Sequence, residues 1–334
     1  MTHRLSRRTA LLATASLPLS TLAQGQSFDA TVGRARALDQ LHGLVVVHRG
    51  DLRLARAFRG PAVDRPVNVK SVSKTIVATL TGIAVDRGAV PGIDARLGDV
   101  APELIPAGAD PRVGDITLED LVTMQAGLER TSGPNYGAWV KSANWVADAL
   151  GRPFVAEPGT RFLYSTGSFH VLGAALSRAT GRSLLELARD WLGAPLGIAI
   201  PAWTRDPQGF YLGGNNMALS PLGLARFGEL WRRGGAFDGR RVFSRAWIEA
   251  AWTPRTRSPW SGDMYGYGWF LTRLGGHDTA YARGYGGQML YVVPTLDLTV
   301  AVTSDPTRPA RTSGHVGDLH ALVAETIMPS IENA

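Results

Sequence analysis

The sequence predicts an α+β fold in which helices flank one antiparallel sheet and an all-helical lobe is inserted into the chain. Strand-like apolar patterns stand near both ends of the chain, and a long block of helix-period segments separates them. No internal repeat or low-complexity linker divides the chain. We therefore expect an α/β lobe from about residues 28–75 and 260–334, a helical lobe over about residues 76–259, and a cleft where the two lobes meet.

Composition narrows the class of protein. The chain has 334 residues, of which 45% are hydrophobic and 19% charged, which suits a globular protein with a sizeable core. It has no cysteine, so disulfides, thiolate metal sites and a cysteine nucleophile are excluded. The net charge is +7, and only three of the 35 basic residues are lysine. The arginines are scattered among acidic residues, so no nucleic-acid partner is expected.

The first 23 residues resemble an export signal. Arg7 and Arg8 precede a short, weakly apolar stretch that ends in the small-residue pattern of residues 20–23. The arginine pair is typical of a twin-arginine signal, and an ordinary secretory signal is the alternative. We expect a periplasmic or secreted protein. No cysteine follows to carry a lipid, and no later run predicts a transmembrane helix, so we expect no membrane anchor once the signal is removed.

The spacing of apolar residues predicts the N-terminal helices and strands. A helix is expected over residues 29–41, then a buried strand over 44–47, a turn at residues 49–51 and a returning strand over 52–58. Apolar residues then surround a helix from Ser71 to Gly88, which predicts that this helix is buried on all sides.

The middle and the end of the chain are read in the same way. Residues 91–115 are rich in Pro, Gly and Asp and predict a loop, after which Thr117 and Asp120 form a capping box for a helix that stops at Gly127. Further helices are expected over 138–150, 168–180, 183–193, 220–234, 244–252 and 315–328. Strands are expected over 267–271, 289–293 and 298–303.

The chemistry of the chain centres on Ser71 and Lys74. Common hydrolase, nucleotide and metal motifs are missing from the sequence, and its histidines lack ligand spacing, so no cofactor or metal is expected. Residues three apart share one face of a helix, which places the Lys74 amine beside the Ser71 hydroxyl. A lysine can deprotonate a serine only where burial lowers its pKa, and an apolar helix provides that burial. The alternative is a capping serine followed by a solvated lysine.

Two later segments suit the same site. Tyr164 precedes a helix and would relay protons beside Lys74, whose charge would favour the phenolate; a core tyrosine is the alternative. The glycine-rich segment 282–288 leads into a strand, and its glycines allow close approach to a substrate. Main-chain N–H groups of Ser71 and Tyr285 would then form an oxyanion hole, the alternative being a simple turn or bulge.

These three elements, in this order, resemble the serine β-lactamase and penicillin-binding-protein superfamily, and most of all the class C β-lactamase-related branch of aminohexanoate-dimer hydrolases and esterases. Residues 116–128 and 218–228 resemble further family segments. The resemblance implies a β-lactamase/transpeptidase-like fold and one hydrolase domain over residues 24–334. It also implies that Ser71 is acylated, that Lys74 and Tyr164 share the general-base and general-acid work, and that the main chain of Tyr285 polarises the carbonyl.

Two departures from the family pattern bear on the substrate. Thr166 replaces the asparagine that often holds a substrate amide, and Arg283 with Gly284 stands where the family usually has Lys or His, then Thr or Ser, then Gly. We expect Thr166, Arg283, Gly284 and Gly286 to bind the substrate. Both changes favour a small amide or ester, such as an aminohexanoate oligomer, as the substrate. A β-lactamase or D-Ala-D-Ala carboxypeptidase is the first alternative, and an inactive cell-wall-peptide binding module is the second.

Aromatic residues of the helical lobe are candidates for the walls of the cleft, with ordinary core packing as the alternative. They are Tyr136, Trp139, Trp203, Phe210 and Tyr211.

Overall fold

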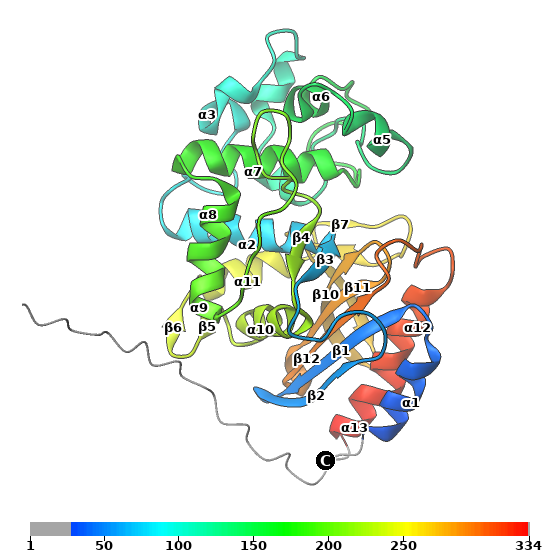
Figure 1. Ribbon diagram of the computed structural model, residues 1–334. Coiled ribbons are helices and arrows are strands. Elements are labelled where there is room, and N and C mark those ends of the chain that lie inside the picture. Colours follow the sequence, from blue (N-terminus) through cyan, green and yellow to red (C-terminus); the bar gives the residue numbers. More distant parts are fainter. Residues whose placement is uncertain (1–27, 333–334) are drawn as a thin grey trace, which may run out of the picture.

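A computed structural model of the chain describes residues 28–332, so the predicted export signal lies outside the described residues. One sheet of eight strands has the order β2-β1-β12-β11-β10-β9-β8-β7 and is antiparallel throughout. Helices cover both of its faces, and a helical lobe stands beyond one end (Figure 1). The predicted α+β class is therefore confirmed.

The two ends of the chain share the middle of this sheet. β1 pairs with β12 on one side and with β2 on the other, and every residue of β12 is buried. The strands of the sheet are β1 (Leu41–His48), β2 (Asp51–Ala57), β7 (Thr256–Arg257), β8 (Met264–Tyr265), β9 (Phe270–Leu274), β10 (His277–Gly284), β11 (Gln288–Val293) and β12 (Leu298–Ser304). Two small ribbons lie outside it: β3 (Val67–Lys70) with β4 (Met217–Leu219), and β5 (Ala236–Phe237) with β6 (Arg240–Arg241).

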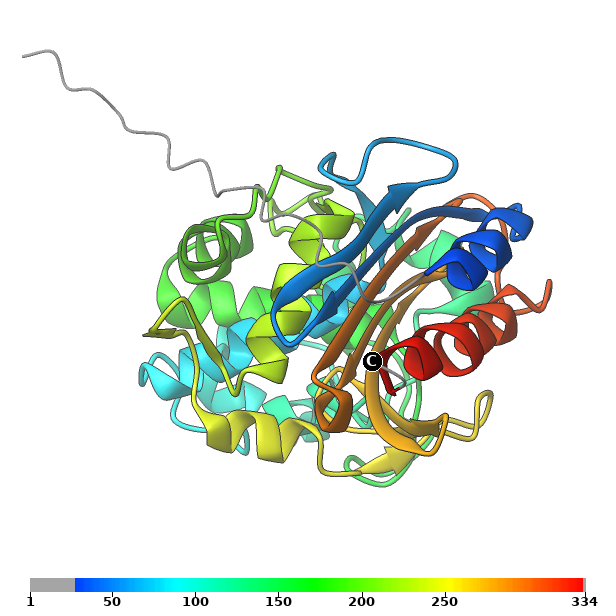
Figure 2. The same cartoon turned by 90° about the horizontal axis from the view of Figure 1, so that it is seen from below.

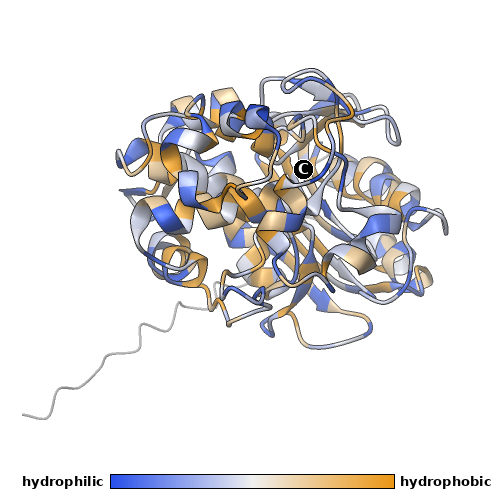
Figure 3. Cartoon of the chain, turned by 90° about the horizontal axis from the view of Figure 1, so that it is seen from above, coloured by the Kyte–Doolittle hydropathy of each residue, from blue (hydrophilic) through white to orange (hydrophobic). Residues whose placement is uncertain are grey.

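Terminal helices cover one face of the sheet, and helices from the middle of the chain cover the other (Figure 2). The first group is α1 (Asp29–Ala37), α12 (His315–Leu322), the π-helical turn η6 (Val323–Ile327) and α13 (Met328–Glu332). The second is α2 (Val72–Asp86), α10 (Pro221–Arg232) and α11 (Arg245–Ala251), with a short turn η5 (Pro294–Leu296) between β11 and β12. Apolar ribbon gathers toward the interior in Figure 3, and hydrophilic ribbon lies mostly on the periphery.

The helical lobe is built around α7 (Figure 1). Its α-helices are α3 (Leu97–Val100), α4 (Leu118–Val122), α5 (Tyr136–Trp139), α6 (Trp145–Leu150), α7 (Thr166–Thr180), α8 (Leu184–Ala188) and α9 (Ala194–Leu196). Short turns link them: η1 (Pro102–Leu104), η2 (Pro111–Asp115), η3 (Gly133–Asn135) and η4 (Arg189–Gly193). The capping box of Thr117 and Asp120 is present at the start of α4, as predicted.

Helix α2 joins the two lobes. It is buried from Val72 to Ala84, as its continuous apolar surface predicts. It contacts α7 in the helical lobe and β10 in the sheet. Its N-terminus, where Ser71 lies, therefore opens between the lobes. No helix within residues 28–332 combines the length and apolarity needed to cross a bilayer.

Several predicted boundaries are wrong. The first helix ends at Ala37 because β1 takes Leu41 and the residues after it into the sheet. Short helices occupy part of the predicted loop over 91–115, and the helix predicted over 138–150 is broken between α5 and α6, where Asn144 caps a new start. The helix expected to reach Gly127 stops at Val122. Strand β10 was not predicted, although only the turn at Gly275 and Gly276 separates it from its partner β9, and β9 begins at Phe270 rather than at Tyr267.

Candidate active site

Ser71 stands at the junction of β3 and α2. Lys70, immediately before it, has a φ of 51°, and its backbone N–H donates to the side chain of Asn68. Ser71 is the N-cap residue of α2, yet its hydroxyl makes no capping hydrogen bond. Ser73 instead fixes the turn, because its hydroxyl donates to the Lys70 carbonyl and accepts from the N–H of Met217 on β4. The Ser71 hydroxyl is therefore left free of a capping task.

The Lys74 amine lies against that hydroxyl. Its Nζ is 3.0 Å from Ser71 Oγ, 3.3 Å from Thr166 Oγ1 and 2.5 Å from the carbonyl oxygen of Gly214. The residue is only 2% exposed, and burial lowers the pKa of its amine to about 7. A solvated lysine, the alternative weighed from the sequence, is excluded. The pair has the geometry of a hydroxyl and a lysine that can take up its proton.

Tyr164 completes this cluster from the segment before α7. Lys74 Nζ lies over its ring, 4.9 Å from the ring centre. Burial raises the pKa of the Tyr164 phenol, and this outweighs the opposing effects of a hydrogen bond with Ser71 and the charge of Arg283. The expectation that Lys74 favours the phenolate is therefore wrong, and the phenol is protonated at neutral pH.

A second segment of the helical lobe holds the start of α7. The hydroxyl of Ser132 accepts from the N–H of Thr166, and that of Thr131 accepts from the N–H of Gly167, so two free donors of the helix are satisfied from outside. Ser132 Oγ is also 2.9 Å from Thr166 Oγ1. Thr166 is 3% exposed and is engaged by Lys74 and Ser132, so its predicted contact with substrate stays a prediction.

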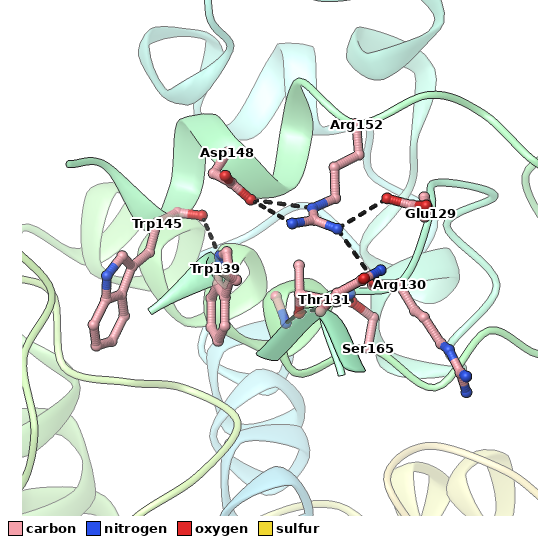
Figure 4. A network of polar contacts seen from close by, with 10 residues as sticks. Glu129, Arg130, Thr131, Trp139, Trp145, Asp148, Arg152 and Ser165 are labelled. Carbon is pink, nitrogen blue, oxygen red and sulfur yellow. Dashed lines mark hydrogen bonds and ion pairs between the residues drawn. The ribbon is translucent and has the colours of Figure 1, made fainter. Parts of the chain in front are cut away.

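Partly buried charges fix the backbone of this second segment (Figure 4). Arg152 donates to Asp148, Glu129 and the main-chain carbonyl of Arg130, while Ser165 accepts from the N–H of Thr131. The side chain of Arg130 points away from these contacts, as Figure 4 shows. The network thereby holds the backbone from which the Arg130 side chain extends.

The glycine-rich segment begins at the end of β10 and leads into β11, the strand that was predicted to follow it. Gly284 packs so closely on the β3 segment that a Cβ would collide with the carbonyl oxygen of Val69, two residues before Ser71. A cavity of about 220 Å³ adjoins it. Four residues singled out in the sequence line this cavity together with residues 309–312: Arg283, Gly284, Tyr285 and Gly286. The end of β10 next to Tyr285 therefore lies against the residues just before Ser71, although Ser71 itself does not line the cavity.

The aromatic wall of the site differs from the one predicted. Trp139 and Tyr211 are buried at 0% and 3% exposure and pack in the core, so for these two the cleft assignment is wrong. Trp260, from the loop before β8, is 44% exposed instead, and its ring centre is 6.1 Å from that of Tyr164. The Arg130 guanidinium lies over the same indole at 5.4 Å. No motif surrounds Trp260, so sequence reasoning had no signal for it.

The fold and this cluster define the class of protein. A serine and a buried lysine at the start of a helix between a helical lobe and an antiparallel sheet are the features of the serine β-lactamase and penicillin-binding-protein superfamily. Residues 28–325 match the model of the Beta-lactamase family, and the chain belongs to that family. Its members are generally serine hydrolases.

Solved structures with the same fold carry several activities in their names. A protein of Bacillus anthracis described as a 6-aminohexanoate-dimer hydrolase superposes with a TM-score of 0.74 at 18% identity, over 88% of this chain and 80% of that one. EstCE1, a hydrolase with promiscuous acyltransferase activity, superposes with a TM-score of 0.72 at 17% identity, over 89% and 99%. At such identities the likeness establishes the fold alone.

A curated relative matches over a shorter stretch. Fimbrial assembly protein FimD of Dichelobacter nodosus is 30% identical over 146 residues, which make up 40% of this chain. The match spans only 35% of the length of that relative.

Proposed function

We propose that this protein is a serine hydrolase that cleaves a small amide or ester through an acyl-enzyme on Ser71. The observation that carries the proposal is the 3.0 Å contact between the Ser71 hydroxyl and a buried lysine amine whose pKa is lowered to about 7. Such an amine is largely neutral just above neutral pH and can accept a proton there.

Acylation begins when Lys74 Nζ takes the proton of the Ser71 hydroxyl as Oγ attacks the substrate carbonyl carbon. The carbonyl π electrons move onto oxygen, where the N–H groups of Ser71 and Tyr285 stabilise the resulting charge. The tetrahedral intermediate then collapses and the bond to the leaving group breaks. The leaving amine or alkoxide takes a proton from the Tyr164 hydroxyl, and Lys74 returns a proton to that phenolate.

Deacylation repeats these steps with water as the nucleophile. Water gives a proton to the neutral Lys74–Tyr164 pair and attacks the acyl carbon, and the bond from that carbon to Ser71 Oγ breaks. The proton returns to Ser71 Oγ, which releases a carboxylic acid and restores the enzyme.

A small amide or ester is the substrate class that the site supports. Thr166 offers only a hydroxyl where the related enzymes often have an amide, and this hydroxyl is engaged by Lys74 and Ser132. Arg283 lines the cavity next to Tyr285. A broad amide and ester specificity, as in the aminohexanoate-dimer hydrolases and esterases, fits these residues better than the recognition of a β-lactam or D-Ala-D-Ala terminus. We also propose that the protein acts in the periplasm or outside the cell.

The test is covalent labelling followed by a substrate panel. Purified protein is treated with a fluorophosphonate probe, and the modified residue is located by mass spectrometry. We expect the label on Ser71 and none on the Ser71→Ala variant; Ser73→Ala is the matched control because Ser73 has a structural task. Wild-type protein that takes no label would instead favour the binding-module alternative. Hydrolysis of p-nitrophenyl esters, short amides, nitrocefin and D-Ala-D-Ala peptides then separates the substrate classes.

A further inference from the structure

A buried histidine and aspartate hold the loop that contacts Lys74 and have no place in the proposed reaction. His170 is on α7 and Asp206 is in the loop that precedes β4; their exposed fractions are 0% and 6%. His170 Nε2 is 3.0 Å from Asp206 Oδ2. The rings of Trp139 and Trp145 pack on the imidazole with centres 5.8 and 5.6 Å away, which keeps the pair dry. Hydrogen bonds are stronger where water is excluded, so this pair can fix the position of the backbone groups that it binds.

Asp206 organises the loop between the two lobes. Its Oδ1 accepts the N–H groups of Gln208 and Phe210, and its own N–H donates to the Phe210 carbonyl. Both carboxylate oxygens are thus used, one to close the turn of its own loop and the other to attach this turn to α7 through His170.

His170 holds the same loop at a second point. Its Nδ1 accepts the N–H of Gly213 at 3.5 Å, a long hydrogen bond. An accepting Nδ1 requires the proton on Nε2, where it is donated to Asp206. Gly213 and Gly214 also pass close to the backbone of α7, since a Cβ on Gly213 would collide with the Phe169 carbonyl.

The next residue of this loop is the one that meets Lys74. The carbonyl oxygen of Gly214 lies 2.5 Å from Lys74 Nζ and is the shortest of the three contacts of that amine. His170 binds Gly213, the residue directly before Gly214, and thereby fixes the position of the Gly214 carbonyl.

We propose that His170 and Asp206 are positioning residues that set the Gly214 carbonyl against Lys74 and thereby place the amine beside the Ser71 hydroxyl. The inference rests on the proposed role of Lys74 as the base. It adds to that role the loop that positions the Lys74 amine.

The direction of the expected effect follows from hydrogen bonding. A carbonyl oxygen stabilises an ammonium more than a neutral amine, so loss of the Gly214 contact lowers the pKa of Lys74 further. The other groups that face the amine stay in place: Ser71, Tyr164 with Arg283 beyond it, and Thr166. A general loss of stability would not change the pKa of Lys74 in the protein that remains folded.

Lysine titration tests this without any substrate. The chain has only three lysines, so protein labelled with ¹³C at lysine Cε gives three signals, and the Lys74→Met variant identifies the one from Lys74. We expect His170→Gln and Asp206→Asn to lower the titration midpoint of Lys74 by about one pH unit. Gln208→Ala loosens only the loop tip, where that side chain donates to the Ala143 carbonyl, and should leave the midpoint unchanged.

Acylation and the wild-type tautomer supply two further readouts. The two variants should lower the maximal rate of fluorophosphonate labelling by roughly tenfold to a hundredfold and shift its acid limb to lower pH. In wild-type protein labelled with ¹⁵N-histidine, Nδ1 of His170 should be unprotonated, a result that needs no variant to fold.

The outcomes separate the two proposals. Wild-type protein that is not labelled at all contradicts the proposed function, while the lysine titration still tests the positioning role. An unchanged Lys74 midpoint in both folded variants, or a protonated Nδ1 in the wild type, overturns the positioning role whatever the activity.

Discussion

Three uncharged oxygen atoms surround the amine of Lys74, and this explains its chemistry. Two belong to the hydroxyls of Ser71 and Thr166 and one to the carbonyl of Gly214. Hydrogen bonds to uncharged oxygens satisfy the amine but offset the loss of water around a full charge only in part. Burial therefore lowers the pKa of Lys74 to about 7.

The rate of acylation should follow this titration. Only the neutral amine can accept the Ser71 proton, so kcat/KM for acylation should fall about tenfold per pH unit below about 7 and level off above it. The measurement is the pH profile of ester hydrolysis or of probe labelling.

Lys74→Arg is the matched control, since arginine keeps the charge but does not deprotonate in proteins. Its acylation should fall by at least about a hundredfold at every pH. Near-normal turnover by this variant would rule out Lys74 as the base.

Trp260 offers a second prediction at the level of a single side chain. Its exposed indole lies against Tyr164 and beneath the Arg130 guanidinium, so it should contact the apolar part of a substrate at the mouth of the site. Trp260→Ala should raise KM for aryl and long-chain esters by roughly tenfold and change that for acetate esters little. Val155→Ala, a change at another exposed apolar residue, is the control, and equal KM effects on all esters would contradict the assignment.

At the scale of elements, the site depends on how closely β10 approaches the strand before Ser71. Gly284→Ala places a methyl group against the carbonyl oxygen of Val69, and the backbone of either strand must shift. We expect acylation to fall by roughly a hundredfold, because the N–H of Tyr285 moves with the strand. Thermal unfolding and probe labelling measure the two effects.

Gly33→Ala is the comparison, since a Cβ there meets nothing within 4 Å and the residue lies inside α1. This variant should be slightly more stable than wild type and fully active. A Gly284→Ala protein with wild-type labelling would show that the close approach has no part in acylation.

Most elements with strong local signals could be predicted from the sequence, and β10 is the exception. The buried helix from Ser71, the capping box at Thr117 and the late strands follow from period and caps that lie within a few residues. Strand β10 pairs with β9 and β11, its neighbours in the sequence, and the Gly275–Gly276 turn before it is a hairpin signal that the prediction missed.

The candidate site contains residues that local spacing brings together and residues that meet only through long-range contacts. Ser71 and Lys74 meet because three residues of helix bring them together, so spacing alone sufficed. Gly214 reaches Lys74 across 140 residues of sequence, and Trp260 reaches Tyr164 from another lobe. Contacts of that range leave no local pattern to detect.

For the whole molecule, the buried lysine links stability to pH. The pKa of Lys74 is about 7 in the folded protein against 10.5 as the ordinary value, so the unfolded chain binds more protons between these pH values. The contribution of this residue to the free energy of unfolding therefore rises with pH from about 7 to 10.5. Below pH 7 the amine is charged in the folded protein, and the full free-energy cost of burying this charge lowers the stability.

Comparison with Lys74→Met isolates this effect. Relative to that variant, the unfolding free energy of wild type should increase by on the order of a few kcal/mol between pH 7 and 10. Denaturant unfolding at several pH values measures it, with Lys141→Met as control. Parallel curves for wild type and Lys74→Met would contradict a lowered pKa.

The pairing of β1 with β12 has a consequence for biosynthesis. Leu41 pairs with Ser304, so the first long strand cannot complete its pairing until a strand much later in the sequence has been translated. During synthesis the helical lobe can collapse on itself, but the edge of β1 that pairs with β12 stays unpaired until β12 has left the ribosome. Nascent chains halted before residue 298 should therefore be bound by chaperones or degraded. Chains that include β12 can pair it with β1 and complete the sheet in one late step.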